Sequence, residues 1–318
     1  MTLGRTSAIA PGASFAAHKS SDHRTLSTGL ALFAVYVIWG STYLVMRIAL
    51  DALPPFLMSG LRFTIAGGLL MLFLRSRGER LPSAKQWAAS ALVGSLLLVL
   101  GNGLVAVAER SVDTGVAATI VATMPLWMAA IGAAWGERIT RIELLGLALG
   151  FAGVAVLNHA GALSFGSFDA IAILLAPIAW ALGSVWSRRL PLPPKLMATA
   201  AEMLCGGGIL LLLAAISGER PTGALDLRAL GALAYLIVMG SLVAFSAFTY
   251  LLRNTRPTVA SSYAYVNPVI ALVLATYLTH EPLTGQKVLA CALTALGLIL
   301  STTFTPKLRV KAGRTDTT

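Results

Sequence analysis

The sequence predicts an all-α, polytopic membrane protein of ten transmembrane helices, arranged as two inverted five-helix repeats. Three observations predict this fold class. The chain is 57% apolar and only 12% charged, which leaves too little polar side chain to cover a surface exposed to water. Its apolar residues come in blocks long enough to cross a bilayer. Its two halves also align with each other, which indicates an internal repeat.

Ten apolar blocks, each of about 18–24 residues with almost no charge inside, define the expected helices. They lie at residues 28–50, 54–74, 87–108, 114–135, 142–159, 169–187, 195–216, 229–252, 258–279 and 287–304. None of them has the alternating polar positions of a barrel strand. We expect a first repeat at 28–160 and a second at 169–304, between disordered cytoplasmic tails at 1–27 and 305–318.

The distribution of Lys and Arg predicts the orientation in the membrane. An even number of spans places both termini on one side, and that side would hold 18 of the 24 basic residues, against five on the other. Such an excess is typical of the cytoplasmic face. We therefore expect a multi-pass protein of the cell inner membrane with both termini cytoplasmic. The net charge of +11 comes largely from short loops, so the lipid bilayer is an expected partner and nucleic acid is not.

The internal repeat can be followed at fixed offsets. The stretch GERITRIELL aligns with HEPLTGQKVL at an offset of 144, which pairs Glu137 with Glu281. Earlier in each half the offset is 140 and pairs Gly67 with Gly207. Apolar sequence can align with itself by chance, but charged and proline matches at fixed offsets argue against that explanation. Because each half has an odd number of helices, the second copy must enter the bilayer from the opposite side.

Two charged residues inside the apolar blocks are the strongest site candidates, because an ionised group in hydrocarbon is costly unless it is paired or wetted. Arg62 lies in the second block and Glu202 in the seventh, at equivalent positions of the two repeats. Two interpretations stay open. In the first, Arg62 holds a substrate carboxylate and Glu202 binds a substrate amine or a coupled proton. In the second, the charges are structural: they form an ion pair, or Arg62 caps backbone carbonyls.

Aromatic, hydroxyl and amide groups near the middle of three blocks predict a pocket for a small organic molecule. The candidates are Trp39, Ser41, Thr42 and Tyr43 in the first block, Asn102 in the third, and Tyr263, Tyr265 and Asn267 in the ninth. The alternative for each aromatic residue is helix packing or a position in the interfacial belt.

Helix-breaking residues predict local departures from regular helix at membrane depth. The segment Gly101–Gly103 and the prolines Pro125, Pro177 and Pro268 all fall inside apolar blocks. Backbone groups released by such residues are tolerated where they line a cavity or contact a neighbouring helix.

The sequence contains no HExxH, GxSxG or Walker-type motif. We therefore expect no catalytic residues, no cofactor and no metal site. Cys205 and Cys291 both lie inside apolar blocks and are expected to pack as small side chains.

Six segments carry a family resemblance: IWGSTY, LRF around Arg62, GNGLVAVAE, the stretch from Pro125 to Glu137, AEMLCGG around Glu202, and SYAYVNPV. With these motifs the chain resembles the drug/metabolite transporter superfamily, specifically its ten-helix members with two EamA domains, and it is most similar to the YedA-like branch. The resemblance implies export or exchange of amino acids, other small metabolites or toxic compounds, driven by ion or substrate gradients.

The leading hypothesis is therefore a secondary active transporter that exports small organic metabolites, amino acids or drugs by alternating access, with a proton as one candidate for the coupled ion. One alternative is a membrane scaffold or sensor that binds a small molecule or partner without transporting it. Another is a membrane-embedded enzyme that acts on lipids, for which only Arg62 and Glu202 offer a catalytic pair. A monomer and a homodimer are both compatible with the sequence.

Overall fold

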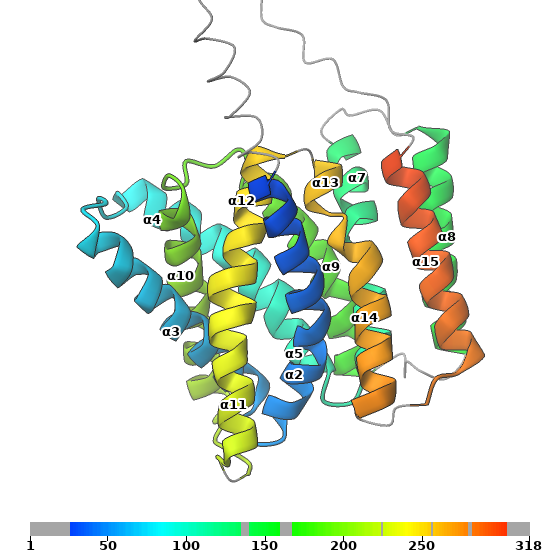
Figure 1. The fold of residues 1–318 in the computed structure, drawn as a ribbon, viewed down its shortest axis with the longest axis horizontal. Helices are drawn as coiled ribbons and strands as arrows, with labels where there is room; N and C mark the ends of the chain where they lie inside the picture. Colours follow the sequence, from blue (N-terminus) through cyan, green and yellow to red (C-terminus); the bar gives the residue numbers. More distant parts are fainter. Residues whose placement is uncertain are drawn as a thin grey trace, which may run out of the picture.

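The computed structural model describes residues 26–134, 140–159, 167–223, 225–255, 257–278 and 282–303. Within these ranges the chain folds into helices that lie side by side as a bundle (Figure 1). Seven of the described helical stretches are long and apolar enough to cross a membrane. The all-α, polytopic fold class predicted from the sequence is confirmed.

Each expected span corresponds to one helical stretch, and several stretches combine two or three elements. The first repeat contains η1 (Val35–Trp39) with α2 (Gly40–Leu50), α3 (Pro55–Ser76), α4 (Ala84–Gly94) with η2 (Ser95–Gly103) and α5 (Leu104–Ala108), α6 (Thr114–Val121) with α7 (Met124–Ala134), and α8 (Arg141–His159). The second repeat contains α9 (Phe168–Trp186), α10 (Leu196–Ile216), α11 (Leu227–Tyr235) with η3 (Leu236–Phe245) and α12 (Ser246–Asn254), α13 (Pro257–Ala260) with α14 (Tyr263–Leu278), and α15 (Gly285–Thr303).

The pair of helices α3 and α10 shows the relationship between the repeats at the level of single atoms. A Cβ added to Gly67 would lie 2.9 Å from the backbone nitrogen of Leu204, and one added to Gly207 would lie 2.6 Å from the backbone nitrogen of Thr64. The offset of 140 relates Gly67 to Gly207 and Thr64 to Leu204, so the repeat exchanges one contact with the other. The two glycines therefore occupy equivalent places in one antiparallel seam, where small residues let the backbones approach closely.

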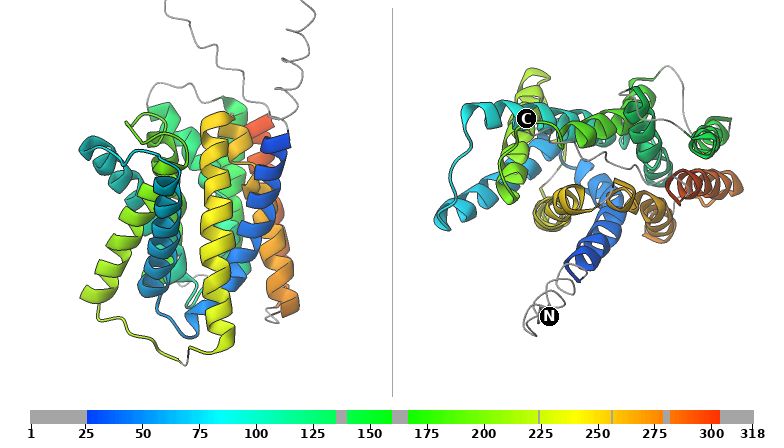
Figure 2. Two further views of the ribbon diagram at one scale, coloured as in Figure 1. Left: turned by 60° about the vertical axis from the view of Figure 1, so that its left-hand side comes forward. Right: turned by 90° about the horizontal axis from the view of Figure 1, so that it is seen from above.

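The pair α8 and α15 repeats this arrangement at the offset of 144. A Cβ on Gly153 would lie 2.9 Å from the backbone oxygen of Ala290, and a Cβ on Gly297 would collide with the backbone oxygen of Gly146. Figure 2 shows this pair at one edge of the bundle, with α3 and α10 toward the opposite edge. The central helices between the two pairs are those that carry most of the site candidates. The aligned residues Glu137 and Glu281 lie outside the described residues.

Polar side chains fix the beginnings of several helices. Ser83 accepts a hydrogen bond from the backbone of Gln86, and Asp226 accepts one from the backbone of Ala229, as N-cap residues do. The start of α3 is capped from the other repeat, because the carboxylate of Glu219 accepts hydrogen bonds from the backbone of Leu57 at 2.7 Å and of Phe56 at 3.4 Å. This contact ties the two repeats together at one end of the α3–α10 seam.

Three stretches, η1, η2 and η3, are wound as π-helix inside longer helices. The hydroxyl of Ser241 donates to the carbonyl of Leu236, five residues earlier, at 3.0 Å. The segment Gly101–Gly103, predicted to be irregular, lies at the end of η2. Pro125 follows the break between α6 and α7, whereas Pro177 and Pro268 lie inside α9 and α14. π-Helical turns are frequent at functional sites because they turn side chains and carbonyls out of the regular ladder.

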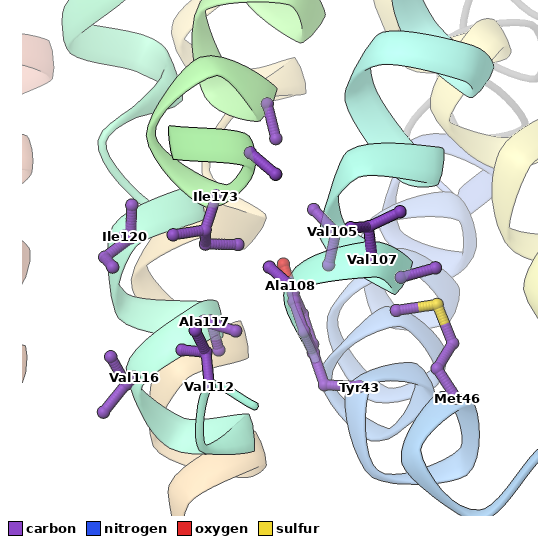
Figure 3. Packing of buried hydrophobic residues seen from close by; sticks show 14 of the residues in the cluster. Tyr43, Met46, Val105, Val107, Ala108, Val112, Val116, Ala117, Ile120 and Ile173 are labelled. Carbon is purple, nitrogen blue, oxygen red and sulfur yellow. The ribbon is translucent and has the colours of Figure 1, made fainter. Parts of the chain in front are cut away.

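The apolar core continues from the central helices toward α6 and α9. Figure 3 shows Tyr43 and Met46 of α2 facing Val105 and Ala108 of α5. Tyr43, Met46 and Val105 also contribute to the wall of the cavity described next.

Candidate functional site

A small cavity lies between central helices of both repeats. Its wall consists of Trp39, Thr42, Tyr43, Met46, Arg62, Phe63, Leu98, Gly101, Asn102, Val105, Val121, Ala176, Trp180, Gly240, Phe245, Tyr263 and Asn267. All three π-helical stretches contribute residues to it. The wall is mostly aromatic and aliphatic with a few polar groups, which is the usual composition of a site for a small organic ligand.

Arg62 is the charged residue of the cavity wall and is 2% exposed. Its Nε donates to the hydroxyl of Ser241 at 2.8 Å, and its Nη1 lies 3.6 Å from the sulfur of Met46. The guanidinium also lies over the ring of Phe63, 4.7 Å from the centroid. A Cβ on Gly240 would lie 2.8 Å from Nη2 of Arg62, so this glycine provides the space that the side chain occupies. These contacts fix the position of the guanidinium. It has five N–H donors, which is more than the number of acceptors in these contacts.

Glu109 is a buried acid beside the cavity that the sequence analysis did not select. It is 0% exposed, follows α5, and lies one helical turn beyond Val105 of the cavity wall. Its charge interacts electrostatically with Arg62 and Tyr43. The guanidinium of Arg47 donates to its backbone carbonyl. The sequence signal was its position within GNGLVAVAE, but at the end of an apolar block a carboxylate is usually exposed.

Trp39 is the centre of the aromatic part of the wall. Its ring centroid lies 5.5 Å from that of Trp180 and 5.1 Å from that of Tyr263, both in edge-to-face geometry. Its Nε1 donates to the carbonyl of Gly240 at 3.2 Å. Trp39 thus joins the first helix of the first repeat to the π-helical stretch η3 of the second repeat.

The amide residues of the wall differ in how far their hydrogen bonds are satisfied. With its side-chain amide turned so that the nitrogen faces two carbonyl oxygens, Asn267 donates to the carbonyls of Tyr263 and Tyr36 at 3.2 and 3.1 Å. The oxygen Oδ1 of Asn102 is buried and accepts no hydrogen bond within the described part of the chain. Thr42 donates to the carbonyl of Trp39 at 2.8 Å. Asn102 therefore contributes to this wall an acceptor that is not used by the described residues.

The structure thus brings seven of the ten candidate residues to one cavity, namely Trp39, Thr42, Tyr43, Arg62, Asn102, Tyr263 and Asn267. Ser41 lies outside the wall, because its face of α2 turns toward α11, where its hydroxyl lies 2.7 Å from that of Tyr235. The side chain of Tyr265 lies outside the described residues.

Glu202 also lies outside the cavity wall, so the structure does not bring it to Arg62. The repeat symmetry provides the reason. Equivalent residues on α3 and α10 have symmetry-related surroundings. The Arg62 side chain extends to Ser241 of η3, whereas the backbone oxygen of Glu202 lies beside Gly94 of α4. The two residues therefore lie at contacts with different helices.

We find no cluster of three or more His, Cys, Asp or Glu side chains within the described ranges that could hold a metal ion. Lys287 of α15 forms an ion pair with Asp113, which precedes α6, at 2.6 Å. Neither residue belongs to the cavity wall.

Comparison with known proteins adds to this geometry. The model of the EamA-like transporter family matches the chain twice, at residues 26–159 and 167–303. Among curated proteins, the uncharacterized inner membrane transporter YedA of Escherichia coli K12 is 44% identical over 273 residues, which are 86% of this chain and 89% of that protein. The uncharacterized transporter YvbV of Bacillus subtilis is 29% identical over 81% of this chain and 85% of its own length. A solved crystal structure with 22% identity covers 87% of this chain and 96% of its own, with a TM-score of 0.65, and shows the same fold.

Proposed function

This chain belongs to the EamA-like transporter family, as its motifs predict, and from that premise we propose that it is a secondary active transporter of small organic solutes. The two repeats would expose the central cavity to each side of the membrane in turn. We propose the inner membrane as its location, cytoplasmic termini as its orientation, and export as its direction, on the grounds of the basic-residue distribution and the family resemblance.

The observation that carries this proposal is the buried guanidinium of Arg62 at the wall of a largely apolar cavity. A cation at membrane depth is costly unless an anion or water compensates it. Ser241 and Met46 are neutral partners, and the buried Glu109 contributes a negative charge nearby. The N–H groups of the guanidinium that these contacts do not use would bind a carboxylate or another anionic group of a solute. The aromatic rings of Trp39 and Trp180 would contact the apolar part of the same solute.

The origin of the wall residues supports an alternating-access mechanism. Arg62 and Asn102 belong to the first repeat, and Gly240, Tyr263 and Asn267 belong to the second. A solute held by both repeats would respond to any movement of one repeat relative to the other. The glycine contacts at Gly67 and Gly207 would allow such movement because helices with small residues at their contact can slide closely past each other.

The test is the thermal stability of the purified protein in detergent against a panel of amino acids, other carboxylates, nucleosides, sugars and cationic drugs. A solute that binds only the folded protein stabilises it by about 2.7 kcal/mol at a hundredfold excess over its Kd. We expect stabilisation by a class that carries an anionic group. Arg62→Ala should remove this stabilisation and Arg75→Ala, at the exposed end of the same helix, should keep it.

Transport of the identified solute into or out of liposomes then separates the rival functions. Movement of solute that is lost in Arg62→Ala supports the transporter. Binding without any flux across liposomes would favour the scaffold or sensor. If Arg62→Ala unfolds the protein in the absence of solute, Arg62→Lys, which keeps the charge but loses the planar donor fork, is compared in the same assay.

A further inference from the structure

Three buried side chains at the contact between α4 and α10 carry oxygen atoms that the described part of the chain leaves without a hydrogen-bond partner. They are Ser90 Oγ, Thr199 Oγ1 and Glu202 Oε1. Ser90 and Thr199 are 0% exposed and Glu202 is 2% exposed. Buried polar groups are almost always hydrogen-bonded, and an unpaired carboxylate is especially costly at membrane depth. None of the three belongs to the wall of the central cavity.

The contacts between the two helices place these three residues along one seam. A Cβ on Gly94 would lie 2.5 Å from the backbone oxygen of Glu202, and a Cβ on Gly206 would lie 2.9 Å from the backbone oxygen of Gly94. Ser90 precedes Gly94 by one helical turn, so it lies on the same face of α4. Thr199 precedes Glu202 by three residues and Gly206 by seven, so all three share one face of α10. The helical spacing therefore places Ser90, Thr199 and Glu202 on the contacting faces of α4 and α10, at neighbouring levels of the seam.

From this arrangement we propose that Ser90, Thr199 and Glu202 form a site for a small monovalent cation at the α4–α10 seam. One carboxylate and two hydroxyls are hard oxygen ligands, which suit Na⁺ or a proton. A single carboxylate compensates one positive charge, and no further acid accompanies it on the described faces of this seam, so a divalent ion is not favoured.

The charged and titratable residues of the elements packed around Glu202 set its electrostatic surroundings. They are Arg62 and Arg75 of α3, Lys85 of α4, Cys205 of α10, and Tyr250 and Arg253 of α12. Arg62 is directed to Ser241, and Lys85 is exposed. Arg253 interacts electrostatically with Glu202, while its guanidinium donates to the carbonyl of Pro193. Arg253 is thus held by the backbone at the edge of α10, which leaves the carboxylate available to a mobile cation.

The proposed cation site and the central cavity share one helical stretch. Ser90 and Gly94 of α4 lie at the seam, and Leu98 and Gly101 of η2, directly beyond them, line the cavity. Gly206 packs against both parts of this stretch, because a Cβ added to it would contact Gly94 at the seam and Leu98 at the cavity wall. A cation that draws α4 and α10 together would therefore act on the helix that forms part of the solute site. This coupling role rests on the proposed transport function, whereas the binding of the cation does not.

The experiment measures thermal unfolding of the purified full chain in detergent in two titrations. The first raises NaCl at fixed pH, with choline chloride keeping the ionic strength constant, and the second varies pH in sodium-free choline chloride. We expect one of them to raise the Tm of the wild type, which identifies Na⁺ or a proton as the cation. Glu202→Gln should abolish that response. Ser90→Ala and Thr199→Val should raise the half-saturating cation concentration about tenfold.

Two matched variants serve as controls. Glu79→Gln removes an acid that follows α3 and is not one of the three proposed ligands, and Thr119→Val removes a buried hydroxyl that donates to the carbonyl of Gly115. Both should keep the wild-type cation response. A wild type that responds to neither titration, or a Glu202→Gln variant that responds like the wild type, overturns the proposal. If Glu202→Gln does not fold, Ser90→Ala and Thr199→Val decide by the same criterion.

The same samples separate this proposal from the proposed function. Stabilisation by solute depends on Arg62, and stabilisation by cation depends on Glu202. A cation response without any stabilising solute contradicts the proposed function and leaves the cation site standing. Stabilisation by a solute without any cation response contradicts the cation site and leaves the proposed function standing.

Discussion

Arg62 Nε and Ser241 Oγ lie 2.8 Å apart, and this hydrogen bond joins α3 of the first repeat to η3 of the second. Ser241 in turn donates to the carbonyl of Leu236 at 3.0 Å. The π-helical winding of η3 therefore decides where the buried guanidinium points. The orientation of the Arg62 charge in the cavity therefore depends on residues of both repeats.

Replacing Ser241 by Ala should destabilise the protein, because the Arg62 Nε–H group would remain buried without its acceptor. We expect the free energy of unfolding to fall by about 1–3 kcal/mol, measured by thermal unfolding in detergent without solute. Ser217→Ala removes a hydroxyl at the end of α10 that bonds only to its own helix and should change stability little. Equal stability of the Ser241 and Ser217 variants would mean that the Arg62 contact contributes nothing.

Gly240→Ala should displace the Arg62 side chain with little effect on folding. The new methyl group would lie 2.8 Å from Nη2, which is the end of a flexible side chain and can move. We expect the affinity for the stabilising solute to fall at least tenfold, a change of about 1.4 kcal/mol. Gly231→Ala, in the neighbouring helix α11, meets nothing within 4 Å and provides the control. Unchanged affinity in Gly240→Ala would remove Arg62 from the solute site.

Gly67→Ala should separate α3 from α10, because its methyl group would meet the backbone of Leu204 at 2.9 Å. Overpacking of this kind costs about 1–3 kcal/mol, and thermal unfolding measures it. The adjacent Gly68 provides a matched control, since a Cβ there meets nothing within 4 Å. Gly68→Ala should be neutral or stabilising by up to about 1 kcal/mol through lower unfolded-chain entropy. Similar Tm values for both variants would contradict the close seam.

Glu219→Ala should weaken the start of α3, because the amides of Phe56 and Leu57 lose their carboxylate acceptor. Loss of a helix cap costs about 1 kcal/mol, and high salt should reduce the difference because the carboxylate also interacts with the helix dipole. Glu79→Ala is the control at the equivalent position of the first repeat. A loss as large in Glu79→Ala as in Glu219→Ala would show that the cap is not specific to α3.

The positions of the helices along the chain could be predicted from the sequence, because apolar blocks of bilayer length have few other structural solutions. The observed boundaries differ from the predicted ones by three residues or fewer. The rotation of each helix about its own axis could not be predicted in the same way. In a membrane, the lipid-facing and protein-facing sides of a helix are both apolar, so periodicity carries little information.

Ser41 and Thr42 illustrate this limit. They are adjacent and similar in chemistry, but only Thr42 reaches the cavity wall. The π-helical turns rotate the following residues relative to a regular helix, and nothing in the composition of η1 or η3 announces them. Glu109 was missed for a related reason, since its burial depends on the neighbouring Arg47 and Arg62 rather than on its own surroundings in sequence.

The symmetric seam between α3 and α10 has a consequence for how such a chain could diverge during evolution. Two identical five-helix units assembled about a two-fold axis would carry the same residue at both equivalent positions, so a substitution in one would be imposed on the other. Joining both units in one polypeptide removes that constraint. In this protein the equivalent positions hold Arg62 and Glu202, which gives the duplicated halves opposite charges and frees each half to recognise a different partner.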